Sequence, residues 1–345
     1  MQQTTPVVRG FESSDYDRLV EIYNANYPDS PTSVDEIRYS DESRDKSKYH
    51  LSRFACTGPD AGQVLGFGKV NHAWWMFHPQ KFIVEVLVDP MYRRKGNGRT
   101  IYDWLELKLK ELHATTAWAT VKENLPASMA FAMKRGFVEK KRMWESWLDP
   151  SKVDSDLFQK YAEKASGQGI KISTLTVEKV NGPEKVRELY ELSQELEGDV
   201  PFPVPYTPIS YEQWVKSMLE SPSLLPDGFL VASDGNRYIG HSIVFRIDKE
   251  PSSLWQIMTG VRREYRGRDI GMALKLGVID FARRNGYNMI KTWNHSDNAP
   301  MLAVNARLGF KREVGWLSME KNLTQKGGLG KKRESWPKRL DPTVV

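Results

Sequence analysis

A basic turn that contains glycine is the segment of this sequence best suited to chemistry. Its members fall within seven residues: Arg93, Arg94, Lys95, Gly96, Asn97, Gly98 and Arg99. Glycine lets the backbone close on a ligand without a Cβ in the way, and four clustered cations attract an anion. The turn therefore indicates a site for a pyrophosphate or a similar polyanion.

The flanking elements would present the backbone of this turn to the anion. The apolar, β-branched segment 82–88 predicts a strand before the turn, and a helical pattern follows it. The first turn of a helix leaves N–H groups unpaired, and the helix dipole adds about half a positive charge there. The turn is not a Walker loop, because no Gly-Lys-Ser/Thr follows, and its spacing does not match Gly-x-Gly-x-x-Gly.

The same pattern occurs again at an offset of 173 residues. Arg93 corresponds to Arg266, Gly98 to Gly271 and Gly136 to Gly309, without a gap between these landmarks. Upstream, segments 15–27 and 184–196 have the apolar spacing of amphipathic helices, while 64–70 and 238–247 are typical of strands. The sequence therefore predicts an internal repeat.

The repeat predicts a fold of the α+β class, or mixed α/β, made twice in tandem, with a mixed central sheet flanked by helices in each domain. We expect an N-terminal domain at 1–160, a small, polar linker at 160–169, a C-terminal domain at 170–323 and a basic, disordered tail at 324–345. The tail holds six cations and two anions, so it supplies most of the net charge of +6. The body is nearly balanced, and we do not expect a nucleic-acid partner.

Composition excludes several classes of protein. With 40% hydrophobic and 27% charged residues, the 345-residue chain can form a globular core. No apolar stretch reaches the ~18 residues of a membrane span, and no secretory signal is readable at the N-terminus. The single cysteine, Cys56, excludes an intrachain disulfide and a cysteine-cluster metal site, and the histidines lack metal-ligand spacing. We expect a cytoplasmic protein with no metal and no membrane partner.

The pattern Arg93-x-x-Gly96-x-Gly98, between a strand and a helix, resembles the acetyl-CoA-binding motif of the GNAT superfamily, the Gcn-five-related N-acetyltransferases. The family has a second landmark, which lies beside the pantetheine arm of the cofactor. Two segments here look like it, 134–137 and 307–310. In each of them a Gly-Phe step follows 38 residues after the last glycine of the turn. The resemblance covers about residues 6–323. Its layout is similar to that of the tandem group that includes mycothiol synthase.

The resemblance implies acetyl-CoA as co-substrate and assigns its contacts. In the first half, main-chain groups of Leu87 and Val88 would pair with the pantetheine, and residues 93–99 would hold the pyrophosphate. The second-half counterparts are Thr259, Gly260, Val261, Arg266, Gly267, Arg268 and Gly271. Asn298 and Asn305 resemble asparagines that contact CoA in relatives, although Asn298 also fits a helix N-cap because Pro300 follows it.

The two predicted cofactor sites differ in charge. Asp269 stands where the family's first glycine would be, and residues 262–269 hold four cations and two anions. A carboxylate close to a phosphate is repulsive unless it points away. The first half is therefore the better predicted site for acetyl-CoA.

Acetyl transfer to an amine needs a base, an oxyanion donor and an acid for the leaving thiolate. Glu85 matches the position of a glutamate base in some relatives, and its alternative is a strand carboxylate paired with a nearby cation. Many relatives carry a tyrosine acid three residues before the L/R-G-F step. The corresponding residues here are Ala132 and Asn305, so the general acid is not identified.

Two further segments are candidates for an acceptor site. The aromatic run 74–77 precedes the cofactor strand and would wall a cleft or form part of a core. The acidic residues Glu191, Glu195, Glu197 and Asp199 precede the proline-rich segment 200–208, in a region that commonly covers the acceptor in this fold. Their alternative is a solvated helix face.

The function expected from these features is an acetyl-CoA-dependent N-acetyltransferase that acts on the amine of a small molecule. The alternatives are a protein or peptide N-acetyltransferase, and a non-catalytic protein that binds CoA or nucleic acid. The sequence discloses neither the acceptor nor the oligomeric state.

Overall fold

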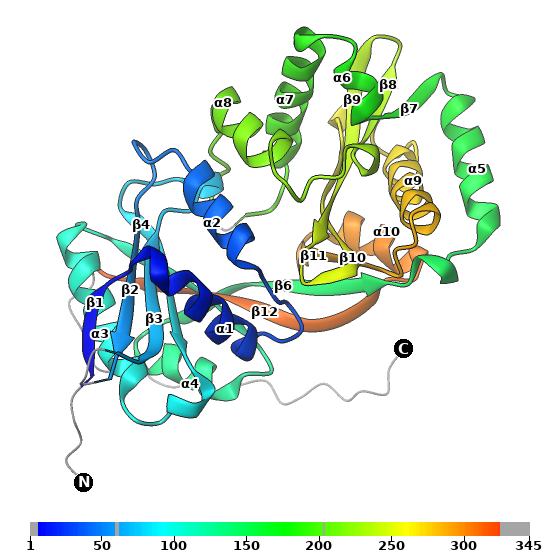
Figure 1. Ribbon diagram of the computed structural model, residues 1–345. Helices are drawn as coiled ribbons and strands as arrows, with labels where there is room; N and C mark the ends of the chain where they lie inside the picture. Colours follow the sequence, from blue (N-terminus) through cyan, green and yellow to red (C-terminus); the bar gives the residue numbers. More distant parts are fainter. Residues whose placement is uncertain (1–5, 59–61, 203, 325–345) are drawn as a thin grey trace.

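The computed structural model describes residues 6–58, 62–202 and 204–324, so most of the basic tail lies outside the described residues. Its strands form one mixed sheet that runs through both halves of the chain (Figure 1), in the order β1-β2-β3-β4-β5-β12-β6-β11-β10-β9-β8-β7. The α+β class and the tandem repeat expected from the sequence are confirmed.

The strands of the first half are β1 (Val7–Gly10), β2 (Leu51–Thr57), β3 (Val64–Asn71), β4 (Lys81–Val88), β5 (Thr116–Lys122) and β6 (Val138–Leu148). Those of the second half are β7 (Ile170–Thr174), β8 (Leu230–Asp234), β9 (Arg237–Ile247), β10 (Glu250–Val261), β11 (Met289–His295) and β12 (Lys311–Asn322).

The α-helices are α1 (Tyr16–Asn26), α2 (Val34–Ser43), α3 (Asn97–Glu111), α4 (Pro126–Lys134), α5 (Ser155–Ser166), α6 (Leu175–Lys179), α7 (Pro183–Glu197), α8 (Tyr211–Trp214), α9 (Ile270–Arg284) and α10 (Ala299–Leu308). Short 3-10 or π segments are η1 (Ser13–Asp15), η2 (Trp74–Met76), η3 (Pro90–Tyr92), η4 (Pro150–Lys152), η5 (Val215–Leu219), η6 (Pro226–Gly228) and η7 (Arg263–Tyr265). None of the helices in the described part of the chain has the length and apolar character needed to cross a bilayer.

The last strand of each half is exchanged. Strand β12 pairs with β5 of the first half, and β6 pairs with β11 of the second half. The two exchanged strands pair with each other, and Trp316 faces Met143, its own counterpart at the offset of 173. Equivalent residues that face each other are what a local two-fold relation between the halves requires. In Figure 1, β6 and β12 run from one half into the other.

Each exchanged strand contributes to the core of the other half. Leu317 and Met319 of β12 lie in the first-half core with Ile101 and Leu105 of α3, and Leu148 of β6 lies in the second-half core with α9. Burying a leucine or methionine side chain contributes about 1.5–3 kcal/mol. The two halves therefore depend on each other for stability.

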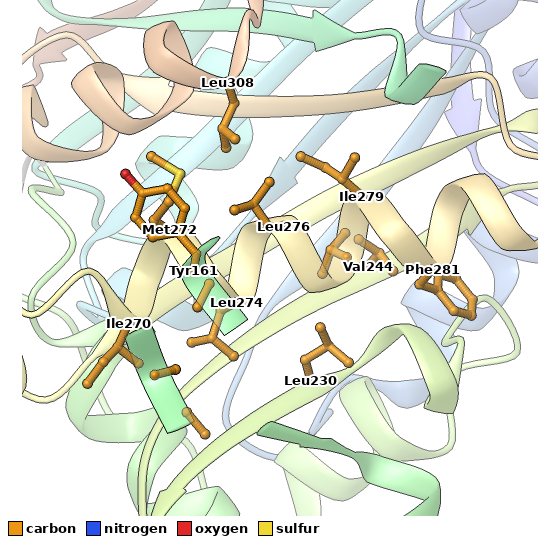
Figure 2. Packing of buried hydrophobic residues seen from close by; sticks show 14 of the residues in the cluster. Tyr161, Leu230, Val244, Ile270, Met272, Leu274, Leu276, Ile279, Phe281 and Leu308 are labelled. Atoms are coloured by element: carbon orange, nitrogen blue, oxygen red, sulfur yellow. The ribbon is translucent and has the colours of Figure 1, made fainter. Parts of the chain in front are cut away.

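Helix α9 forms the centre of the second-half core. Figure 2 shows its apolar side chains, among them Leu274, Leu276 and Ile279, packed with Leu230, Val244 and Leu308 from the sheet and α10. Tyr161 of α5 joins this cluster, so part of the segment 160–169 that the sequence suggested as a linker is a packed helix. The domain boundaries themselves stay a prediction.

Candidate functional site

The two basic turns have the same backbone conformation. In the first turn Arg94 and Gly96 have positive φ angles of 63° and 91°, and their counterparts Gly267 and Asp269 have φ angles of 75° and 63°. Such left-handed conformations favour glycine. Glycine fills only one of the two left-handed positions in each turn, the second position in the first half (Gly96) and the first position in the second half (Gly267). Helices α3 and α9 begin directly after Gly96 and Asp269. The unpaired N–H groups of each first helical turn therefore adjoin the basic residues, as the sequence predicts.

A strand with a free edge leads into each turn. Strand β4 pairs with β5 only over Lys81–Ile83, and β10 pairs with β11 only over Ser253–Gln256. Beyond Ile83, β4 pairs only with β3, and beyond Gln256, β10 pairs only with β9. The free edges contain Leu87 and Val88 in the first half, and residues 259–261 in the second. The carbonyl of Val88 accepts from Nδ2 of Asn26 at 3.2 Å, and that of Val261 accepts from Nε of Arg266 at 3.0 Å. Other backbone groups along these edges have no strand partner and need another one, so both edges are suited to bind an amide-containing chain.

The first-half turn packs closely on α4. A Cβ added to Gly98 would lie 3.3 Å from a ring carbon of Phe131 and 3.5 Å from Val88. A Cβ added to Gly271 would meet only Val261, at 3.8 Å. The repeat therefore provides two equivalent glycines that differ in the space around them.

Equivalent arginines of the two turns have chemically different partners. Arg93 donates to the amide oxygen of Asn26, at the end of α1, while Arg266 donates to the carboxylate of Asp199. Asn26 and Asp199 are themselves 173 residues apart. Asp199 also accepts from Nε of Arg263 at 2.9 Å, and its hydrogen bond with Arg263, ahead of that with Arg266, holds its pKa below the ordinary value.

Other charges extend this contrast. In the second half Arg262 pairs with Glu195, and Asp269 turns its carboxylate to Lys164 at 2.5 Å. Arg268 donates to Gln168. In the first turn Arg94 and Lys95 are exposed, and no carboxylate among the described residues lies within 4.0 Å of either. The first turn thus keeps more of its positive charge available, in line with the charge difference expected from the sequence.

A cavity of about 420 Å³ adjoins the first turn. Its lining residues are Arg99, Tyr102, Asp103, Glu106, Lys134, Arg135 and Lys321. Four of these are cations and two are carboxylates, and Arg135 stacks on Phe131, with its guanidinium carbon 3.4 Å from the ring centroid. The Lys134-Arg135 step singled out in the sequence therefore lies beside the turn, where it adds positive charge.

Glu85 lies on β4 and points toward the α1 face of the sheet. Its neighbours Val84 and Val86 pack on the opposite face with α3, since alternate strand residues face opposite sides. The carboxylate is 2.8 Å from Nζ of Lys69, and both side chains are about a quarter exposed. The ion pair considered as the alternative for Glu85 is present, and its role as a base stays a prediction.

Two tyrosines near Glu85 were not singled out in the sequence. Burial, followed by the charge of Glu85, raises the pKa of Tyr27 to about 12 and raises the pKa of Tyr23 further. Arg93 lowers the pKa of Tyr27, so this phenol lies within electrostatic reach of both Glu85 and the basic turn. The i,i+4 spacing of the two tyrosines on the α1 segment was the available signal.

The exchanged strand β12 places an aromatic side chain beside Tyr27. The ring of Trp316, on β12, lies 5.4 Å from that of Tyr27, and its Nε1 donates to buried Glu145 at 3.0 Å. Trp316 comes from the second half, so no local pattern could assign it to the first-half site.

The second half has no carboxylate at the position equivalent to Glu85, where Met258 stands. It has instead a shielded carboxyl group on another element. Glu197 lies at the end of α7, and its burial raises its pKa to about 7. The neighbouring Leu196 packs against β10, where a Cβ on Gly260 would lie 3.0 Å from its side chain. In the acidic segment, Glu191 and Glu195 are exposed while Glu197 and Asp199 are partly buried. The solvated-face interpretation therefore holds only for the first two.

The second-half edge also adjoins buried polar groups. Thr259 and Ser242 share a hydroxyl–hydroxyl hydrogen bond of 2.7 Å, Gln256 donates to Ser242 at 2.9 Å, and Lys275 donates to Gln256. Burial lowers the pKa of Lys275 to about 7. In the first half the positions of Thr259 and Gln256 are held by apolar Val86 and Ile83, so the two halves differ in polarity at these positions.

The two predicted asparagines are placed differently. Asn298 is the N-cap of α10, because its side chain accepts from the N–H of Met301. Asn305 is buried and donates to Asn294 at 2.6 Å, while its own Oδ1 has no hydrogen-bond partner in the described structure. The N-cap interpretation of Asn298 is confirmed, and the cofactor contacts of both residues stay predictions.

The aromatic run 74–77 joins the two halves. Thr207 donates its N–H to the carbonyl of Trp75 at 2.9 Å. Met76 packs in a small cluster with Trp118 and Phe202, and the ring of Phe202 lies 5.8 Å from that of His295. The run is thus mainly packing, although Trp74 remains 37% exposed.

Comparison with known proteins identifies a family match over both halves. The model of the acetyltransferase (GNAT) family matches residues 16–137 and 186–310. Among curated proteins, a mycothiol acetyltransferase of Actinosynnema mirum is 33% identical over 87 residues, which is 25% of this chain and 29% of that protein. An uncharacterized N-acetyltransferase of Methanocaldococcus jannaschii is 31% identical over 106 residues, 28% of this chain and 46% of that protein. These matches span less than half of each relative.

Solved structures share the tandem arrangement. A tandem GNAT protein from the clavulanic acid biosynthesis pathway has a TM-score of 0.69 and 20% identity, covering 94% of this chain and all of that one. A GCN5-related N-acetyltransferase from Sphaerobacter thermophilus has a TM-score of 0.67 and 17% identity, covering 93% and 96% of the two chains. At these identities the likeness concerns the fold.

Proposed function

Because this chain belongs to the acetyltransferase (GNAT) family, we propose that it binds acetyl-CoA at the first-half turn and transfers the acetyl group to an amine of a small molecule. The observation that carries the proposal is the first turn itself. A free strand edge, a left-handed glycine turn and exposed cations converge at the start of α3.

The chain's own groups fit the parts of this co-substrate. The free edge of β4 at Leu87 and Val88 would bind the pantetheine amides, and the N–H groups and cations of residues 93–99 would hold the pyrophosphate. The cavity beside Arg99, Lys134 and Arg135 would take a further phosphate. Bound there, acetyl-CoA supplies an activated acetyl group as a thioester.

Glu85 and Tyr27 are the groups proposed to serve the transfer. The amine nitrogen forms a bond to the acetyl carbonyl carbon, the carbon–sulfur bond breaks, and the proton from nitrogen passes to the Glu85 carboxylate. Tyr27, whose raised pKa keeps it protonated at neutral pH, would donate a hydrogen bond to the leaving sulfur. Carboxylates and aromatic rings around this position favour binding of the acceptor as an ammonium ion, which first loses one proton to solvent because only the neutral amine has the lone pair that attacks the carbonyl carbon.

The test of this function is CoA release from the purified full chain with a panel of small amines and amine-bearing peptides. We expect release of free thiol with one or more small amines. Release with peptides alone would support the protein acetyltransferase alternative. Tight acetyl-CoA binding without release across the panel would support a non-catalytic CoA-binding protein.

The different partners of Arg93 and Arg266 lead to a prediction for each half. A carboxylate beside the turn arginine should lower the affinity for acetyl-CoA, and its removal should raise that affinity. Asn26→Asp would place a carboxylate on Arg93 and should weaken acetyl-CoA binding in the first half by about five-fold, or about 1 kcal/mol for a partly screened charge. It would also remove the hydrogen bonds that Nδ2 of Asn26 donates to the carbonyls of Ile22 and Val88, so we expect the thermal midpoint to fall as well. Asp199→Asn would release Arg263 and Arg266 and should strengthen binding in the second half by a similar factor.

Calorimetry on the full chain would measure both effects, because each half alone lacks the last strand of its sheet. Thermal unfolding of each variant controls for folding. If Asn26→Asp leaves every acetyl-CoA affinity unchanged, the first turn is not the site.

A further inference from the structure

A second cavity, of about 680 Å³, lies at the outer edge of the first-half sheet. Strand β1 ends at Gly10, and the N–H of Phe11 still donates to the carbonyl of Arg53 at 3.2 Å, so the edge of β2 is uncovered at Leu51 and Ser52. Side chains of α2 and α3 close the cavity from the two faces of the sheet. In the strand order, β3 and β4 separate it from the place where β4 and β5 part, so it is not part of the proposed acetyl-CoA site.

The cavity carries an excess of positive charge. Its charged lining residues are the cations Arg38, Arg44, Lys46, Arg53 and Lys108 and the carboxylates Asp41 and Glu42. Asp41 is already engaged, because it pairs with Arg53 and accepts from the hydroxyl of Tyr16 at 2.8 Å. Lys108 is also engaged, because it pairs with Glu111 outside the lining at 3.0 Å. The remaining cations, Arg38, Arg44 and Lys46, still outnumber the one carboxylate left to them, Glu42, and the cavity is suited to an anion.

Arg44 is the group that most needs such an anion. Its Nε is buried and has no hydrogen-bond partner among the described residues. A guanidinium donor that loses water without gaining an acceptor is costly, and more so beside another cation. Burial and the neighbouring Arg53 both lower the pKa of Arg44, while Asp41 raises it. Because this Nε has almost no accessible surface, an anion in the cavity would bind the terminal Nη groups of Arg44, for which the described residues provide no hydrogen-bond partner, and would offset the charge of the guanidinium.

Aromatic rings form the rest of the wall. Trp104 on α3 is 39% exposed, although its ring lies only 5.0 Å from that of Phe54. Phe11 and Tyr16 meet edge to face at 4.9 Å. An exposed tryptophan beside cations suits a ligand with a flat ring next to its anionic group. The volume lies within the range of about 300–1,000 Å³ that small-molecule sites occupy.

We propose that this cavity, which we call the edge site, is a second ligand site that binds a small organic anion, with a carboxylate or phosphate held by Arg44 and a planar ring held against Trp104. The proposal does not depend on acetyl transfer. A carboxylate and a phosphate would both be bound by hydrogen bonds and charge attraction from Arg44. The benzoate and phenyl phosphate probes below distinguish the two groups.

The edge site is tested by calorimetry on the full chain with phenyl phosphate, benzoate and inorganic phosphate as probes. The titrations use an Arg94→Met background, which weakens competing anion binding at the basic turn. We expect phenyl phosphate or benzoate to bind at least ten-fold more tightly than inorganic phosphate. The tighter of the two identifies the anionic group.

Two substitutions then locate the binding. Arg44→Met keeps most of the side-chain volume and should weaken the tighter ring-bearing probe at least ten-fold. It should not lower the thermal midpoint of the free protein, because the group removed has an unpaired buried donor. Trp104→Leu should abolish the preference for that probe over inorganic phosphate.

Lys134→Met, in the other cavity, serves as the matched control and should leave the affinity of the ring-bearing probes unchanged. Equal affinity for these probes with and without Arg44 would overturn the proposal, as would the absence of binding at millimolar concentration. The acetyl-CoA affinity of Arg44→Met should equal that of the unmodified chain. Failure of the edge site is thereby distinguished from failure of the proposed function.

Discussion

Replacing Gly98 by valine is expected to reduce acetyl-CoA binding in the first half by about 10–100-fold. The backbone at this position begins α3 and would approach the pyrophosphate, so a branched Cβ enters the space that the ligand needs. The contacts already present leave little room, since a Cβ would lie 3.3 Å from Phe131. The contact with Phe131 is present with and without ligand, so it lowers the stability of the fold, by about 1–3 kcal/mol. The expected loss of affinity comes from the clash with the pyrophosphate, and a factor of about 10–100 corresponds to about 1.4–2.7 kcal/mol of binding free energy.

The repeat supplies the control for this substitution. Gly271→Val places the same side chain at the equivalent position of the second turn, where the nearest atom is 3.8 Å away. We expect little change in thermal stability and no change in first-half affinity. The thermal midpoint of Gly98→Val, measured without ligand, reports the contact with Phe131 separately from the effect on binding. If Gly98→Val folds normally and binds acetyl-CoA as tightly as the unmodified chain, the assignment of the first turn is wrong.

The local parts of the site were predictable because their signals are local. Glycine and cation spacing identified both turns, and the offset of 173 residues correctly paired the elements of the two halves. The offset even extends to the contacts of Asn26 with Arg93 and of Asp199 with Arg266. Those contacts join α1 or α7 to a turn more than sixty residues away, so only the structure could show them.

The strand exchange was not predictable from the same signals. Segments 138–148 and 311–322 both have strand patterns, and each follows a Gly-Phe landmark in the same way. Local propensity does not determine whether β12 pairs with β5 or with β11, since both partners belong to equivalent positions of the repeat. The placement of Trp316 beside Tyr27 depends on that choice, and so does the composition of the proposed acceptor wall.

Replacing Glu85 by glutamine is expected to lower the turnover number by about 10²-fold or more at neutral pH, measured with the best acceptor of the amine panel. Glutamine keeps the shape of the side chain but cannot accept the proton from the amine. The ion pair with Lys69 offers a way to separate this role from a structural one. Lys69→Met removes the ammonium group that lies 2.8 Å from the Glu85 carboxylate and leaves that carboxylate in place.

If Glu85 only forms an ion pair, both variants should lose the same small stability, up to about 1 kcal/mol for a partly exposed pair, and both should keep their turnover. If Glu85 is the base, only Glu85→Gln should lose turnover. A turnover number that is equal in Glu85→Gln and in the unmodified chain from pH 6 to 9 would exclude Glu85 as the base.

Glu197→Gln is the matched variant in the second half and decides which half performs the proton transfer. Burial raises the pKa of Glu197 to about 7, and a base acts only when it is deprotonated. Activity that depends on Glu197 would therefore rise as the pH rises through about 7, and Glu197→Gln would remove both the activity and that rise. We expect Glu197→Gln to retain turnover with an unchanged pH profile. The opposite result, with Glu85→Gln active, would place catalysis in the second half and leave the first turn as a binding site.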